Sequence, residues 1–436
     1  MDSTVNLNYE SDFRTIKVDN VAIYWNLTTE FQSQGSTVSQ QFPRCRLCSG
    51  VILSRLARSI RQFLQNERRK HFFTPHPALR ATLSLRARDL QPKFRYNHAM
   101  KIDIFNHFFP KKYFDTYVDV GSDLKDMGKR VQNIRNIMDL DQRFKVMDEF
   151  GEYCQILSLP APPVEVLAAP DKSPTLAKVA NDGLAELVAK YPKRFLGFVA
   201  CLPMNNPSEL LKEMDRAVTQ LGAFGVQIYT NVAGKPLDLP EFQPFFDEAA
   251  RRDIPIWMHP TRGADFSDYK SETKSKYEIW WTLGWPYESS VAMSRLVFSG
   301  LFDRNPKIKI ITHHMGGMIP YFEGRVGYGW DVLGERTSDE DYVTLRKSMK
   351  KRPVDYFHSF IADTALFGAA SATRCGLDFF GINNVVFASD TPFEPSPGLY
   401  IRETIKVIEG LGLTADEKDR IYCRNAERLL NIPVQK

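Results

Sequence analysis

The sequence predicts a (β/α)8 barrel of the TIM type over residues 101–436, preceded by a basic, poorly structured extension over residues 1–100. Two observations support this prediction. Short apolar runs alternate with helix-like segments from residue 101 onward, and histidines and an aspartate stand at the ends of several runs. This alternation is typical of parallel strands that are buried on both faces of a sheet.

Eight apolar runs are the strand candidates, and each is short enough to be a single strand. In chain order they are Ile102–Phe105, Tyr153–Leu159, Phe195–Leu202, Phe224–Tyr229, Ile254–Met258, Ile308–Thr312, Phe357–Ala362 and Val385–Ser389. Helical patterns lie between most of them or follow the last: Thr175–Lys190, Pro207–Leu221, Leu239–Arg252, Tyr287–Leu301, Ala369–Phe380 and Gly398–Glu409. Eight such units are the number that closes a barrel of this type.

Residues 1–100 differ in composition from the rest of the chain. They hold 15 basic and 7 acidic side chains, a net charge of +8, whereas residues 101–436 have a net charge of −3. One amphipathic stretch, Val51–Gln65, predicts a short helix, and we expect the remainder to be an unstructured extension. The slightly acidic body lacks the clustered basic charge that nucleic-acid binding needs, which argues against a nucleic-acid partner.

The sequence also predicts the cellular location of the protein. No apolar run reaches the roughly 18 residues of a transmembrane helix, and no apolar segment follows the first residues as in a secretory signal. The cysteines are few and widely spread, as expected for reduced thiols inside a cell: Cys45, Cys48, Cys154, Cys201, Cys375 and Cys423. We therefore expect a cytoplasmic protein without a membrane partner.

Two connections are too long for a bare barrel. Residues 108–150 precede the second strand candidate, and residues 260–286 follow His259. The second connection is rich in aromatic residues, among them Trp281 and Trp285. Because long loops after barrel strands lie on the catalytic face, we expect both tryptophans to bind substrate. The alternative is that these rings pack on the protein's own surface or on a second subunit.

Imidazole and carboxylate groups stand at one end of the predicted strands. His107, His259, His313 and His314 end strands one, five and six, and Asp390 ends strand eight. Several of these groups should converge, because the carboxyl ends of all barrel strands meet on one face. Imidazole nitrogens and a carboxylate suit zinc, manganese or iron at a site with one position open for water or substrate.

Three further residues, Phe105, His313 and Asp363, stand close in sequence to strand ends of the predicted site. Alternate strand residues point the same way, so Phe105 shares the direction of His107 and stands where a second ligand could be. A phenyl ring cannot bind a metal ion. His313 is adjacent to His314 and is expected to point to the opposite side of its strand, away from the site. Asp363, near the end of strand seven, is expected to support the groups around the ion.

Four short motifs follow one another at these strand ends: Ile102-Asp103-Ile104-Phe105-Asn106-His107, Trp257-Met258-His259-Pro260, His314-Met315-Gly316-Gly317-Met318-Ile319-Pro320 and Ala388-Ser389-Asp390-Thr391-Pro392. Together they resemble the amidohydrolase superfamily, in the branch related to aminocarboxymuconate semialdehyde decarboxylase, over about residues 101–432. The resemblance implies a divalent metal, zinc or else manganese, held by His107, His259 and Asp390. It also implies His314 and Asp390 as catalytic groups, and a homodimer.

The first motif departs from the pattern of that family. Its first strand usually reads H-x-H or E-x-H, and Phe105 occupies the first of these positions here. The departure removes one expected ligand. The site therefore either holds the metal with three protein ligands and water, or binds it poorly or not at all.

The resemblance favours a metal-dependent decarboxylase of an aromatic or unsaturated carboxylic acid, a small molecule. In that reaction His314 or protonated Asp390 would give a proton to the ring carbon as CO2 leaves. Arg262 and Arg325 could bind the substrate carboxylate, although a solvated salt bridge also accounts for each. Two alternatives stay open. One is a hydrolase of a lactone, amide or C–C bond, with or without a metal, and the other is a degenerate barrel that only binds a ligand.

Overall fold

The computed structural model describes three strands within residues 6–26 and, further along the chain, residues 100–120, 131, 134–337 and 340–432. The chain divides into two compact units, residues 1–74 and 75–436. In the first unit, β1 (Asn6–Glu10), β2 (Phe13–Val18) and β3 (Val21–Asn26) form an antiparallel sheet in that order. The helix expected over residues 51–65 lies outside the described residues, so the expectation for the extension stays a prediction.

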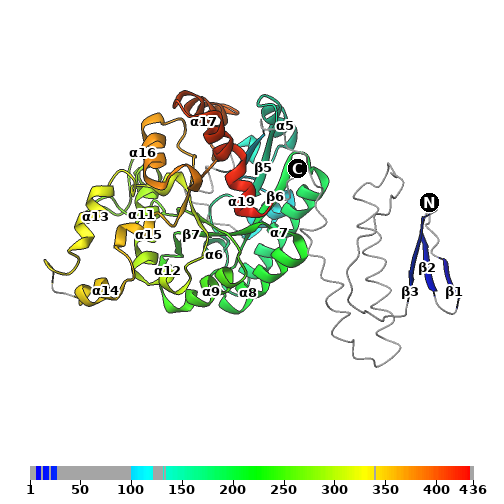
Figure 1. Ribbon diagram of the computed structural model, residues 1–436, viewed down its shortest axis with the longest axis horizontal. Helices are drawn as coiled ribbons and strands as arrows, with labels where there is room; N and C mark the ends of the chain where they lie inside the picture. Colours follow the sequence, from blue (N-terminus) through cyan, green and yellow to red (C-terminus); the bar gives the residue numbers. More distant parts are fainter. Residues whose placement is uncertain are drawn as a thin grey trace, which may run out of the picture. The chain divides into compact units, whose positions relative to one another are not determined.

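The second unit contains the predicted barrel, and the prediction is confirmed (Figure 1). Its eight parallel strands are β4 (Lys101–His107), β5 (Tyr153–Ser158), β6 (Phe195–Cys201), β7 (Gly225–Tyr229), β10 (Ile256–His259), β11 (Ile310–Thr312), β12 (Ile361–Asp363) and β13 (Val385–Val386). These strands follow one another around the sheet in chain order. The ring closes behind β13, where Ile104 N donates to Phe387 O at 3.1 Å and Asp390 N donates to Phe105 O at 3.0 Å.

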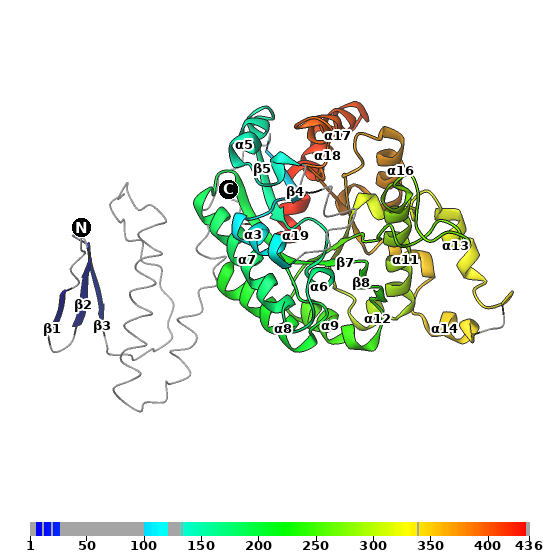
Figure 2. The ribbon, with the colours of Figure 1, turned by 180° about the vertical axis from the view of Figure 1, so that it is seen from behind.

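Helices cover the outside of this barrel (Figures 1 and 2). Those in the six predicted helical segments are α7 (Ser173–Lys190), α8 (Pro207–Arg216), α9 (Gln243–Arg251), α11 (Gly284–Phe298), α16 (Ala370–Phe380) and α17 (Leu399–Gly410). The short α12 (Leu301–Arg304) begins at the last residue of the fourth predicted segment and extends beyond it. The others are α3 (Lys111–Val120), α5 (Leu140–Asp148), α6 (Val164–Leu167), α10 (Ile279–Thr282), α13 (Glu323–Asp331), α14 (Tyr342–Ser348), α15 (Pro353–Phe357), α18 (Ala415–Asp419) and α19 (Asn425–Leu430). Among the described residues, no helix is both long and apolar enough to cross a membrane.

The seventh strand begins later than the sequence predicts. Residues 353–357 form α15, and β12 starts only at Ile361. Pro353 at the start of α15 suits the first turn of a helix, where no backbone N–H is needed. Only three residues, 358–360, separate the buried end of α15 from β12, and Phe357 and Phe360 are both buried, so hydropathy alone could not separate the helix end from the strand.

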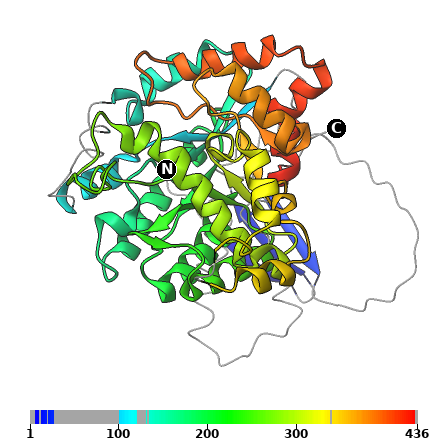
Figure 3. The same cartoon turned by 90° about the vertical axis from the view of Figure 1, so that its left-hand side faces the viewer.

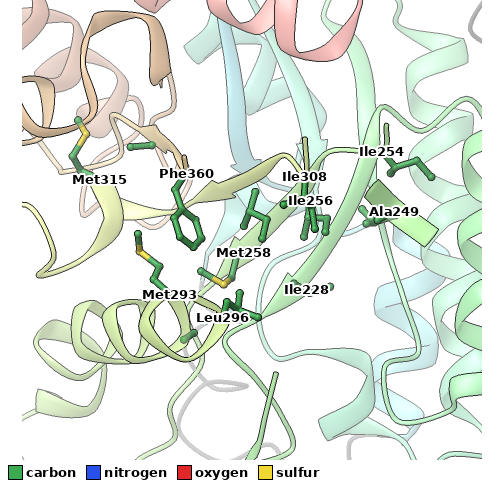
Figure 4. Close-up of a cluster of buried hydrophobic side chains, with 14 of the residues drawn as sticks. Ile228, Ala249, Ile254, Ile256, Met258, Met293, Leu296, Ile308, Met315 and Phe360 are labelled. Carbon is green, nitrogen blue, oxygen red and sulfur yellow. The ribbon is translucent and has the colours of Figure 1, made fainter. Parts of the chain in front are cut away.

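The core has an outer layer between the barrel and its helices and an inner layer inside the barrel. In the outer layer, Met258 of β10 belongs to the same buried cluster as Ile228 of β7 and Met293 and Leu296 of α11 (Figure 4). Inside the barrel, the Trp257 indole of β10 donates to Ile104 O of β4 at 2.9 Å. The segments after about residue 370, coloured orange to red in Figure 3, include α19, whose Leu429 and Leu430 pack with the inner layer.

A buried carboxyl group joins β4 to the segment that follows β13. Asp103 is fully buried and accepts hydrogen bonds from the Ser389 hydroxyl and the Tyr153 hydroxyl, each at 2.5 Å, and from Ser389 N at 3.2 Å. Burial raises the pKa of Asp103 to about 6, although the bonds from Ser389 and Tyr153 oppose this rise. Asp103 thus joins β4 to Ser389, the residue directly before Asp390, and stabilises the edge where the barrel closes.

We predict that Asp103→Ala lowers the free energy of unfolding by about 2–4 kcal/mol, because four buried donors lose their acceptor: the three named above and Phe105 N, which donates to Asp103 Oδ1 at 3.3 Å. Denaturant unfolding followed by circular dichroism measures this change. The control is Asp171→Ala at an exposed position, expected to change stability by less than about 0.5 kcal/mol. Equal stability of the two variants would contradict this role of Asp103.

Candidate metal centre and active site

Four buried side chains from four strands meet at the mouth of the barrel. His107 ends β4, His259 ends β10, His313 follows β11 and Asp390 follows β13. Each offers one ligand atom, and these atoms all lie within 4.8 Å of one another. The sequence predicted convergence of His107, His259 and Asp390, and the structure brings all three together.

Hydrogen bonds at Nδ1 orient the three imidazole rings toward the place where the four ligand atoms meet. His259 Nδ1 lies 2.6 Å from Pro260 O, and His313 Nδ1 lies 2.5 Å from Asp363 Oδ2. His107 Nδ1 lies 3.2 Å from Ser158 Oγ, whose own proton goes to Asn106 O. Each Nδ1 therefore has an oxygen acceptor, which assigns a proton to Nδ1 and turns Nε2 toward the centre, where its lone pair can bind an ion once the ring is neutral.

The central atoms themselves lack ordinary hydrogen bonds. His107 Nε2, His313 Nε2 and Asp390 Oδ1 are buried without a hydrogen-bond partner, although Asp390 Oδ1 lies 3.0 Å from His107 Nε2 and 3.4 Å from His313 Nε2. Buried polar atoms of this kind need an explanation. Three imidazole Nε2 atoms and one carboxylate oxygen that face one point fit a divalent transition-metal ion, which would displace the Nε2 proton of His313.

The expectation that His313 points away from the site is wrong. That expectation assumed strand alternation through both histidines, but β11 ends at Thr312. His314 then adopts a left-handed backbone with φ of 53°, at the start of the 3-10 turn His314–Gly316. The two imidazole rings therefore lie on the same side, with their centroids 3.8 Å apart.

Phe105 lies in the wall of the centre. Its ring stacks on the His313 ring with centroids 3.9 Å apart, and its centroid lies 5.6 Å from that of His107 and 5.8 Å from that of His259. The predicted shared direction with His107 therefore holds. Phe105 offers the centre no donor atom, and His313 offers one from the facing strand.

His314 contacts the other oxygen of Asp390. Its Nε2 lies 3.3 Å from Asp390 Oδ2, so one carboxylate joins the cluster to a fourth imidazole. Burial raises the pKa of Asp390, but contacts with His107, His313 and His314 outweigh burial and hold that pKa well below its usual range. Burial lowers the pKa of His314. Asp390 is therefore ionised at neutral pH.

Asp363 holds the tandem histidines in place, as its predicted supporting position suggests. Its Oδ2 binds His313 Nδ1, and its Oδ1 accepts from His314 N at 3.0 Å. Burial lowers the pKa of His313, but Asp363 and Asp390 outweigh burial and raise it to about 9. Without an ion, His313 is therefore a cation between two carboxylates.

A narrow pocket opens beside the cluster. The predicted residues Trp281 and Trp285 line it together with His259 and Asp390. Trp285 lies nearly parallel to His314, with centroids 6.5 Å apart. The sequence reasoning missed the remaining lining residues: Val131, Ala161, Phe367, Phe393 and Tyr400. Phe393 could have been found because it follows Asp390 closely, whereas nothing in the sequence marks Tyr400.

The two arginines predicted to bind substrate lie elsewhere. Arg262 pairs with Glu288 at 2.7 Å and lies over the rings of Phe266 and Tyr287. Arg325 is exposed on α13. Neither residue lines the cavity beside His259. A substrate carboxylate would have to compete with Glu288 for Arg262.

Comparison with known proteins agrees with the family that the sequence motifs resemble. A family model described as amidohydrolase matches residues 133–432. A gamma-resorcylate decarboxylase of Polaromonas is 31% identical over 306 residues, which is 67% of this chain and 87% of that protein. A 2-amino-3-carboxymuconate-6-semialdehyde decarboxylase of Dictyostelium discoideum is 28% identical over 326 residues, 71% of this chain and 86% of that protein.

A solved structure is also similar. It is a dihydroxybenzoic acid decarboxylase of Polaromonas with bound manganese and the inhibitor 2-nitroresorcinol. The similarity has a TM-score of 0.62 and 28% sequence identity, and it covers 77% of this chain and 98% of the other.

We predict that binding of a divalent ion releases about one proton per ion between pH 7 and 8, because His313 must lose its proton to become a ligand. Below the His313 pKa of about 9, the apparent affinity should fall about tenfold for each unit that the pH is lowered. Titration calorimetry in buffers of different ionisation enthalpy counts the protons. Asp363→Asn should reduce the release, and ion binding without proton release in the native protein would contradict the prediction.

Proposed function

The chain belongs to the amidohydrolase family, and we propose that it is a metal-dependent decarboxylase of an aromatic or unsaturated carboxylic acid. The observation that carries this proposal is the convergence of His107, His259, His313 and Asp390 beside a cavity with aromatic walls. The two relatives and the solved structure described above are all decarboxylases, which supports this reaction over hydrolysis.

The ion would be held by the Nε2 atoms of His107, His259 and His313 and by Asp390. When bound, it supplies positive charge next to the substrate carboxylate and an adjacent oxygen. Manganese and zinc both accept this donor set, and the similar solved structure that contains manganese favours manganese as the first metal to test. In this proposal His313 replaces the ligand that the first strand lacks at Phe105.

The substrate would be a small carboxylated molecule with a flat unsaturated ring. Trp281, Trp285 and Phe367 offer aromatic faces on which such a ring can stack, and little of the cavity wall is polar. The polar groups His259 and Asp390 also line this space. The ring would therefore lie between the aromatic walls with its carboxylate at the His/Asp cluster.

His314 or protonated Asp390 would give the proton that replaces the carboxylate. Because the pKa of His314 is lowered and Asp390 is ionised at rest, either group would first take that proton from solvent water. Loss of CO2 breaks one C–C bond, and the ring carbon takes one proton in its place. Asp390 is ionised and lies 3.3 Å from His314 Nε2, so it can orient the His314 ring toward the cavity. Trp285 beside His314 keeps the substrate ring within reach of that proton.

Several finer expectations stay predictions. They are the homodimer, the cytoplasmic location, the absence of nucleic-acid and membrane partners, and substrate binding by Arg262 or Arg325. The pairing of Arg262 with Glu288 weakens the case for Arg262, because a new carboxylate would first have to break that pair.

We predict CO2 release from at least one carboxylated hydroxyaromatic acid, with less than about 1% of this activity after chelation or in His259→Ala. Product analysis and a CO2 assay over a panel of such acids measure it. His358→Ala is the matched control, because His358 lies outside the cluster and contacts Phe379 O. Ring opening without CO2 would instead support a hydrolase. A protein that turns over no substrate would support the ligand-binding barrel.

We predict that His313→Ala retains less than about one tenth of the native metal content. Phe105→His together with His313→Ala should restore at least half of that content, because residue 105 shares the direction of His107. Elemental analysis after dialysis against equal free metal measures both values. Full metal content in His313→Ala would contradict the ligand role of His313.

A further inference from the structure

The long connection between β4 and β5 brings a buried cation to the end of β4. It contains α5, which lies against β5 (Figures 1 and 2). Arg143 of α5 has only 3% of its surface exposed. Burial lowers the pKa of Arg143 to about 10, although Tyr153, Asp103 and Glu394 oppose this fall, so the side chain keeps its charge at neutral pH. A buried charge is costly unless its donors are well satisfied.

The guanidinium of Arg143 binds oxygens at the end of β4 and in β5. Nη1 donates to His107 O at 2.8 Å, Nη2 to Asn106 Oδ1 at 2.6 Å and Nε to Gln155 Oε1 at 2.8 Å. Nη1 also donates to Asn136 O at 3.4 Å. The three nitrogens of one rigid, planar group therefore face different acceptors. One of these acceptors is the backbone carbonyl of His107, whose ring offers Nε2 to the proposed metal ion.

The strand is irregular directly before His107. Between Asp103 and Asn106, the register of β4 against β5 shifts by one residue, which is a β-bulge. A bulge interrupts the ladder and changes the direction of the side chains beside it. The Asn106 side chain replaces part of the ladder here, because its Nδ2 donates to Asp103 O at 3.0 Å and to Ile156 O at 3.1 Å. The place of His107 thus depends on side chains as well as on strand pairing.

Arg143 completes the bonds around the peptide unit that follows His107. The carbonyl of this unit accepts from Arg143, and its N–H, which belongs to Phe108, donates to Ser158 O at 3.0 Å. The N–H of His107 itself donates to Thr391 O at 2.9 Å. Three segments therefore hold the backbone of this residue: β5, the segment after β13, and α5 with its cation.

We propose that Arg143 is a positioning residue: its guanidinium holds the bulged end of β4 in one conformation, and so keeps His107 where Nε2 can bind the metal ion. The inference rests on the proposed function in one respect, that His107 is a metal ligand. Arg143 does not line the pocket beside the cluster, so it acts on the ion through His107 and not on the substrate. Bonds that orient a metal ligand in this way commonly change metal affinity when they are removed.

Two variants of Arg143 separate its geometry from its charge. Arg143→Lys keeps the buried charge but carries its three donors on one nitrogen, which cannot face acceptors on several sides as the planar fork does. Arg143→Met removes the charge and every donor and keeps an unbranched side chain. The dissociation constant for Mn²⁺ should rise at least about tenfold in both variants. If Arg143→Met does not fold, Arg143→Lys carries the test, because its ammonium still donates to part of this set of oxygens.

Asn425→Leu is the matched control for the loss of buried hydrogen bonds. Asn425 is buried at the start of α19, and its Nδ2 donates to Ile382 O and Val385 O, each at 2.8 Å. Val385 begins β13, whereas Asp390 follows the other end of that strand. Asn425→Leu should lower the melting temperature, as the variants of Arg143 do, and leave the dissociation constant for Mn²⁺ within about threefold of the native value.

Electron paramagnetic resonance gives two readouts that need no substrate. The signal of free Mn²⁺ measures the affinity, and the spectrum of bound Mn²⁺ reports the arrangement of its ligands. At saturating Mn²⁺ the spectrum of Arg143→Lys should differ from that of the native protein, because His107 is no longer held in the same place. The spectrum of Asn425→Leu should match the native one.

Two results would overturn the inference. One is an Arg143→Lys protein with native Mn²⁺ affinity and a native spectrum of the bound ion. The other is an Asn425→Leu protein that loses Mn²⁺ affinity as strongly as Arg143→Lys, since the loss would then follow from lower stability alone. A native protein that binds no Mn²⁺ would refute the proposed metal centre, and the inference with it. Mn²⁺ binding without CO2 release from any acid would refute the decarboxylase and leave the test of Arg143 unaffected.

Discussion

The candidate site depends on where three buried imidazoles place their protons. Ser158, Pro260 and Asp363 each offer an oxygen to one Nδ1 atom, so the three Nε2 atoms face one point beside Asp390. In a dry interior, such groups are stable only when each polar atom has a partner. His107 Nε2, His313 Nε2 and Asp390 Oδ1 have no hydrogen-bond partner among the described residues. A divalent ion therefore suits this place better than another hydrogen bond.

The barrel supplies this arrangement at the ends of its strands. Four strand ends bring His107, His259, His313 and Asp390 together, and two of the turns that follow them depart from ordinary backbone geometry. His314 and Asp390 both have positive φ angles, of 53° and 61°. Such conformations cost energy for residues other than glycine and persist only where the surrounding structure holds them. The bonds from His314 N to Asp363 and from Asp390 N to Phe105 O do so here.

The sequence was sufficient for the barrel because hydrophobic runs mark buried parallel strands directly. It was also sufficient for His107, His259 and Asp390, since strand ends of a barrel share one face. It failed for His313, because strand alternation stops at Thr312 and a left-handed residue follows. It could not find Tyr400 as a neighbour of the site. The position of Tyr400 depends on how α17 packs after the chain has folded, and no local pattern encodes that packing.

The most direct test of this account is anomalous diffraction from crystals of the protein loaded with Mn²⁺. The account predicts one strong peak at bonding distance, about 2.0–2.3 Å, from Nε2 of His107, His259 and His313 and from Asp390. It also predicts that Phe105 stays stacked on His313 beside the ion. A fully loaded crystal in which the ion lies elsewhere, or in which His313 Nε2 bonds to another partner, would contradict it.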